Sequence, residues 1–254
     1  MNAYIAFVKK EWLEALRTYK VFLFGIIFTL LGIMNPITAK VTPQLLETFM
    51  PEGIQIQLPD PTALDSWAQF YKNVGQMGLI VLIILISTMI SHEITKGTLI
   101  NILTKGLKRS TVIYAKLTMA TLLWTLSFIL SFALTDVYTR YFWDVNNVHH
   151  AIFAGMCLWL FGLFLISLTF IGGVLFHNSY GSLLVTLIGF VCLMLLGIIE
   201  PIAKFLPVRL ATQNLSIVQG AVSPDSLIPA IWVTFLGILI LNSMTLILFN
   251  KKSI

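Results

Sequence analysis

Six apolar stretches divide the sequence, and each is long enough to cross a lipid bilayer. A helix that spans the hydrocarbon core needs about 20 mostly apolar residues. The stretches predict an all-α integral membrane protein with six transmembrane helices, at about residues 21–39, 74–91, 112–135, 151–176, 181–199 and 227–249. Within the first stretch, Asn35-Pro36 should end or kink the helix, because proline lacks the backbone N–H that continues it.

The segment before the first stretch, residues 1–20, has a helical period of its own. Apolar side chains recur every three or four residues, and charged side chains lie largely between them. Phe7 and Trp12 belong to the apolar face and Arg17 to the charged one. Such a helix lies in the membrane interface with its apolar face toward the acyl chains. We therefore expect an interfacial helix at 1–20, followed by a membrane domain; a plain anchor for the first span is the alternative.

Basic residues give the six helices a direction, because cytoplasmic segments carry an excess of lysine and arginine. With the N-terminus inside, 11 of the 16 basic residues fall on inner segments, provided that Lys116 extends back to the inner interface. We therefore predict that both termini are cytoplasmic and that residues 92–111 form an inner loop. The segments expected outside are 40–73, 136–150 and 200–226, the last with a short interfacial helix.

The composition agrees with a membrane protein, since 57% of the residues are hydrophobic and only 11% are charged. A soluble domain carries about 25% charged residues. Cys157 and Cys192 lie in apolar stretches and are interpreted as small hydrophobic residues rather than as a disulfide or metal ligands. His149 and His150 are adjacent, and adjacent residues do not share a helix face, so no metal site is predicted.

The sequence also lacks the groups that catalysis or ion-driven transport would need. It has no phosphate-binding Gly-x-x-x-x-Gly-Lys-Ser/Thr motif and no zinc-protease or serine-hydrolase motif. None of the six stretches has an ionisable residue near its centre, where proton-coupled carriers need one. We therefore expect a protein that is not an enzyme and that receives its energy from elsewhere.

The most distinctive sequence lies in the predicted inner loop between the second and third stretches. Its characteristic residues are Glu93, Gly97, Thr98 and Leu99, followed by Leu103, Arg109 and Lys116; Lys96 lies among them and is counted with the candidate coupling residues. The run resembles the signature of ABC-2-type permeases, the membrane subunits of ATP-binding-cassette exporters. The resemblance extends over the chain, because these permeases share an amphipathic elbow helix, six spans and a long first outer loop. Many of them have proline where this chain has Gly106, which leaves the shape of the loop open.

The resemblance implies partners and a mechanism. The loop 92–111 would form a coupling helix seated on a separate P-loop ATPase, and that ATPase, not this chain, would bind ATP and Mg. Two permease subunits, as a homodimer or a heterodimer, and two ATPases would make up the transporter in a bacterial plasma membrane. For Glu93 and Arg109 an ordinary solvated loop is the alternative.

Spans one and five give the only indication of the cargo. Phe28, Met34, Phe190 and Met194 lie in these spans, and flexible methionines beside aromatic rings suit a hydrophobic or amphipathic cargo such as a peptide or drug. In size and apolar character the chain is similar to permeases that export antimicrobial peptides and phenol-soluble modulins. Core packing or lipid contact is the alternative for each of these residues. A non-transporting sensor or scaffold subunit, or a membrane enzyme, is the competing function.

Overall fold

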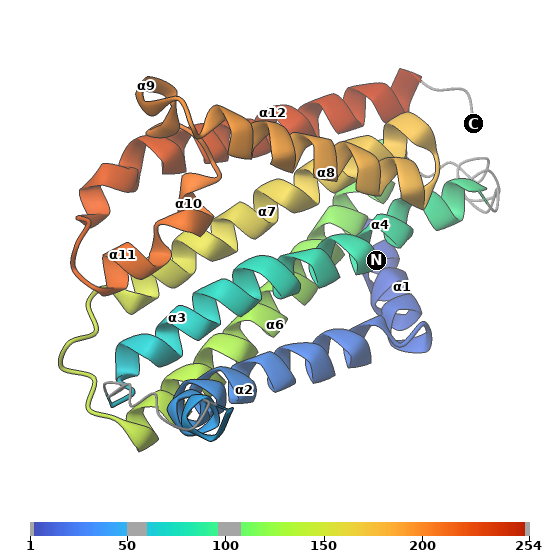
Figure 1. Ribbon diagram of the computed structural model, residues 1–254. Coiled ribbons are helices and arrows are strands. Elements are labelled where there is room, and N and C mark those ends of the chain that lie inside the picture. Colours follow the sequence, from blue (N-terminus) through green and yellow to red (C-terminus); the bar gives the residue numbers. More distant parts are fainter. Residues whose placement is uncertain (1–2, 50–59, 96–107, 252–254) are drawn as a thin grey trace.

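The computed structural model describes residues 3–49, 60–95 and 108–251, and these residues form helices joined by short turns (Figure 1). The longer helices are α1 (Ala3–Arg17), α2 (Lys20–Phe49), α3 (Ala63–Asn73), α4 (Leu79–Thr95), α6 (Arg109–Phe142), α7 (Ala151–Phe176), α8 (Ser179–Leu196) and α12 (Ile228–Lys251). A π-helical segment, Val74–Gly78, joins α3 to α4. No strand occurs among the described residues.

Six helices in the described ranges are long and apolar enough to cross a membrane, which confirms the predicted fold class. They span Lys20–Leu45, Ala63–Met89, Arg109–Phe142, Ala151–Phe176, Ser179–Leu196 and Pro224–Lys251. The fourth has the predicted bounds, and more of it is buried than of any other span. It packs against α4, α6, α8 and α12 and so lies at the centre of the bundle.

The predicted bounds of the outer loop, residues 40–73, are wrong at both ends. Helix α2 continues through Pro36 and Pro43 to Phe49, so Pro36 does not end it. The last turns of α2 run in a different direction from its first turns (Figure 1). Membrane helices tolerate proline where neighbouring helices satisfy the freed backbone groups, and α2 has such neighbours in α3 and α6.

Residues 63–73, expected in the same loop, form α3. The backbone N–H of Thr62 donates to Asp65 Oδ2 at 2.8 Å and so caps the start of the helix. Trp67 and Phe70 are fully buried against the bundle. Because this segment carries many polar residues, its sequence did not predict a membrane span. Its aromatic side chains are nevertheless buried in the bundle, and α3 forms the first part of the second membrane helix.

Small side chains allow the central helices to approach closely. A Cβ at Gly32 of α2 would lie 2.9 Å from the carbonyl oxygen of Ser131 in α6, and a Cβ at Gly162 of α7 would lie 2.4 Å from the ring of Trp124. Close approach through small residues is a main source of helix association in membranes, because lipid gives no hydrophobic driving force between helices.

Before the last span, the chain folds into short helical turns rather than one interfacial helix. These turns are α9 (Glu200–Ala203), α10 (Arg209–Thr212), α11 (Asn214–Val218) and a 3-10 turn (Pro224–Leu227). Asn214 Nδ2 donates to the carbonyl oxygen of Ala154 at 2.7 Å, and the backbone N–H of His149 donates to that of Val218 at 2.9 Å. Both bonds fix the segment against the first turn of α7.

Helix α1 lies across the bundle at the end where α2 and α6 begin and α4 and α12 end (Figure 1). The described basic residues at this end are Lys9, Lys10, Arg17, Lys20, Lys108, Arg109, Lys116 and Lys251. Those at the opposite end are Lys40, Lys72, Arg140, Lys204 and Arg209. The two chain ends thus share the more basic end of the bundle, and the prediction that this end faces the cytoplasm rests on that asymmetry.

Candidate functional site

Of the coupling residues predicted in the inner loop, those at the two ends of the loop lie among the described residues. Helix α4 is described as far as Thr95 and α6 begins at Arg109, so helical residues occupy both ends of the predicted loop 92–111, and residues 96–107 lie outside the described residues. Glu93 falls in the last turn of α4. Five of the predicted residues lie outside the described residues: Lys96, Gly97, Thr98, Leu99 and Leu103.

Arg109, the first residue of α6, contacts the end of the last span. Its Nη1 donates to the carbonyl oxygens of Phe249 at 3.1 Å and Asn250 at 3.4 Å. The last carbonyls of a helix have no partner within the helix and carry the negative end of its dipole. The guanidinium of Arg109 therefore caps α12 and ties the start of α6 to it.

Two turns further along α6, Lys116 forms an ion pair that the sequence did not predict. Lys116 Nζ lies 3.0 Å from both carboxylate oxygens of Glu11 in α1. The exposed fractions of the two side chains are 1% and 3%. Lys116 thus extends toward α1, and its ammonium group is buried against Glu11 rather than exposed at the interface. A usable signal was present: Glu11 falls on the helical face of Phe7 and Ala15, at four-residue spacing.

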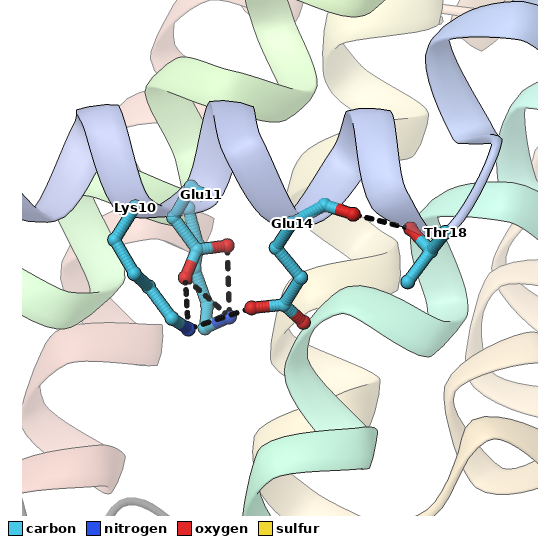
Figure 2. A network of polar contacts seen from close by, with 5 residues as sticks. Lys10, Glu11, Glu14 and Thr18 are labelled. Atoms are coloured by element: carbon cyan, nitrogen blue, oxygen red, sulfur yellow. Dashed lines mark hydrogen bonds and ion pairs between the residues drawn. The ribbon is translucent and has the colours of Figure 1, made fainter.

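A second, more exposed pair flanks the first one. Lys10 Nζ lies 3.0 Å from Glu11 Oε1 and 2.7 Å from Glu14 Oε2 (Figure 2). Burial raises the pKa of Glu14, but its hydrogen bond with Lys10 and the charges of Lys10, Lys116 and Lys20 lower it more, so that the pKa lies below its ordinary value of 4.5. Both acids of α1 thus share the positive charge at this end of α6.

The elbow residues take different positions on α1. Phe7 is buried and faces the bundle with Glu11 and Ala15, whereas Trp12 is half-buried and Arg17 is exposed. The expectation that the whole apolar face meets acyl chains therefore needs correction, since α1 packs on α6 and α2. A local pattern cannot distinguish lipid from a neighbouring helix, because both are apolar.

An apolar groove lies between α4 and α8, with a volume of about 700 Å³. The π-helical segment before α4 contributes Gly75 and Gln76 to it. Such segments often occur at functional sites. The other lining residues are Leu79, Ile80, Ile83, Ile84, Leu165, Tyr180, Leu183, Leu184, Thr186, Leu187, Phe190 and Met194.

The structure brings together only two of the four predicted cargo residues. Phe190 and Met194 line the groove. Phe28 is fully buried instead, with its ring edge-on to Trp124 at a centroid distance of 5.7 Å. Met34 is exposed on α2 and does not line the groove.

Comparison with known proteins assigns the chain to a class. Residues 8–193, from α1 to α8, match the profile of ABC-2 family transporter proteins. The match covers most of the chain, and the protein therefore belongs to the ABC-2 transporter family, as a multi-pass protein of the plasma membrane. A relative from Bacillus subtilis (strain 168), the uncharacterized transmembrane protein YxlG, is 21% identical over 182 residues, which are 70% of either chain.

Proposed function

We propose that this protein is the permease subunit of an ATP-driven exporter whose ATPase is a separate chain. The observation that carries the proposal is the position of the family signature. Glu93 lies in the last described turn of α4 and Arg109 begins α6, both at the basic end of the bundle, where the positive-inside rule predicts the cytoplasm. A cytoplasmic ATPase could bind there without entering the membrane.

In the proposed mechanism the ATPase binds ATP and Mg, and this chain converts its motion into a rearrangement of the spans. Two ATPases and a second permease subunit would be needed, as the family resemblance implies. Closure of the ATPases would push on residues 96–108 and switch the spans between two arrangements. Such switching requires a bistable interface rather than a continuously deformable one.

Replacing Glu93 with alanine tests the coupling role. Loss of one hydrogen bond to a charged group costs about 1.5–3 kcal/mol, so we expect ATPase affinity to fall by about tenfold or more. Co-purification with a candidate P-loop ATPase, and ATP-dependent export from reconstituted vesicles, measure the effect. The matched control is Asp225→Ala, which removes an exposed acid at the opposite end of the bundle. Unchanged binding and export in the Glu93 variant would refute the proposed coupling role.

We propose further that the cargo is an amphipathic helical peptide that enters the groove between α4 and α8. Its volume falls within the range of about 300–1,000 Å³ of ligand sites, and its lining is apolar with a few polar groups. Leu184→Trp fills the groove and is expected to reduce peptide-stimulated ATP hydrolysis severalfold while ATPase binding is retained. Leu239→Trp, an equally exposed position on α12, is the control. If no peptide of a varied panel stimulates hydrolysis by the wild-type complex, the cargo proposal fails.

A further inference from the structure

The first turns of α6 hold two other helices in place. Arg109 bonds to the last carbonyls of α12, and Lys116 pairs with Glu11 of α1. Seven residues of α-helix separate the two attachments, a rise of about 10 Å. Since α6 begins at Arg109, directly after residues 96–108, both attachments lie at the end of α6 that follows these residues.

Burying the Glu11–Lys116 pair between α1 and α6 has a large desolvation cost. Removing two charges from water costs more than mutual attraction often returns, and apolar residues of similar volume commonly stabilise as well or better. An ion pair differs from an apolar contact in its fixed length and direction, so it opposes sliding and rotation of one helix on another. Lys10 and Glu14 also lie beside this pair, and the charge of Lys20 acts on Glu14 as well.

Helix α1 has a second polar contact with the same part of α6. The hydroxyl of Tyr4 lies 2.7 Å from Oγ1 of Thr118, two residues beyond Lys116. Toward α2, the chain turns sharply at Tyr19, whose φ of 58° is in the left-handed region. Polar contacts thus tie α1 to α6, while a tight turn joins it to the first membrane span.

We propose that Glu11 and Lys116 form a clasp that makes α1 move as one body with the start of α6. Displacement of the connection 96–108 then passes through Lys116 and Glu11 to α1, and through the turn at Tyr19 to α2. Glu11 and Lys116 are positioning residues in this scheme. The inference rests on the proposed function, because it assigns these residues a role in transmitting the movement that an ATPase would drive.

The clasp is tested in the complete complex with Glu11→Gln, Lys116→Met and the charge-swapped double variant Glu11→Lys/Lys116→Glu. We expect both single variants to keep ATPase binding and basal hydrolysis, but to export less cargo per ATP by about tenfold, within the usual range of coupling between sites. The double variant should recover part of the loss. Glu14→Gln, which removes a half-exposed carboxylate one turn away, should export like the wild type.

A structural readout on the permease alone separates this inference from the proposed function. Spin labels at the exposed positions Leu13 and Tyr114, with both native cysteines replaced by alanine, report the distance between α1 and α6. We expect one narrow distance distribution in the wild type and the double variant, and a broad one in each single variant. Narrow distributions and full export in both single variants would overturn the clasp. If the wild-type complex moves no cargo with ATP, the proposed function fails, and the label distances still decide whether the pair joins the helices.

Discussion

Replacement of Trp124 with alanine is expected to lower the free energy of unfolding by about 3 kcal/mol, which is the lower end of the range for buried aromatic residues. Trp124 is fully buried, and its Nε1 donates to the carbonyl oxygen of Trp159 at 3.0 Å. Its ring lies against Gly162, with the rings of Phe28 and Phe128 at centroid distances of 5.7 and 5.2 Å. Truncation would leave a cavity where α2, α6 and α7 meet.

The expected loss for Trp124→Ala lies at the lower end of the range for buried aromatic residues because the unfolded helices remain in an apolar environment. In detergent the unfolded helices keep their side chains out of water, so the variant loses packing contacts rather than hydrophobic burial. Unfolding in mixed micelles with increasing SDS measures the change. Trp232→Ala, at an exposed position on α12, is the control and should shift stability by about 0.5 kcal/mol or less. Equal losses in the two variants would show that Trp124 is not part of a packed core.

Removal of one partner of the Glu11–Lys116 pair is expected to destabilise the protein by about 3 kcal/mol, the lower end of the range for a broken buried pair, because the remaining charge stays buried while Glu11 retains its contact with Lys10. The double variant Glu11→Leu/Lys116→Met should be close to the wild type in stability, since apolar side chains can replace both charges. The same double variant should still export poorly if the clasp proposal holds, because an apolar contact does not fix the orientation of α1 on α6.

Unfolding curves of the two single variants and the double variant form a double-mutant cycle that measures this coupling. Lys10→Met serves as the control. Lys10 faces solvent in part, so its loss should cost about 1 kcal/mol or less. Additive losses at positions 11 and 116 would show that the two charges do not interact in the folded protein. Wild-type export by the stable double variant would contradict the clasp.

The position of the six spans could be predicted from the sequence because bilayer thickness fixes their length and lipid fixes their composition. For α7 this was sufficient: an uninterrupted apolar run between His150 and His177 has the bounds that the structure gives. The family, too, was predicted from a short signature, and the match over residues 8–193 confirms it. Of the coupling residues in that signature, Glu93 lies in the last described turn of α4, and Arg109 begins α6 and bonds to the end of α12.

The rest of the candidate site depended on contacts between distant residues. Phe190 and Met194 share a groove with Gly75 because α4 and α8 are neighbours, whereas Phe28 faces Trp124. No spacing along the chain encodes which apolar side chains of one span face another. Of the two spans that the sequence indicated, one and five, the fifth contributes to the groove and the first does not.

By itself, the sequence determined an all-α membrane protein with six spans and the family to which it belongs. Both follow from properties of single segments, namely length, hydropathy and a local signature. Only the tertiary structure decided that α2 continues past Pro36, that the aromatic face of α3 extends the second span, and that Lys116 is buried. In each case a local rule was not sufficient: at Pro36 it allowed either an end or a kink, and contacts with residues more than 25 positions away, such as Glu11 for Lys116, decided the conformation.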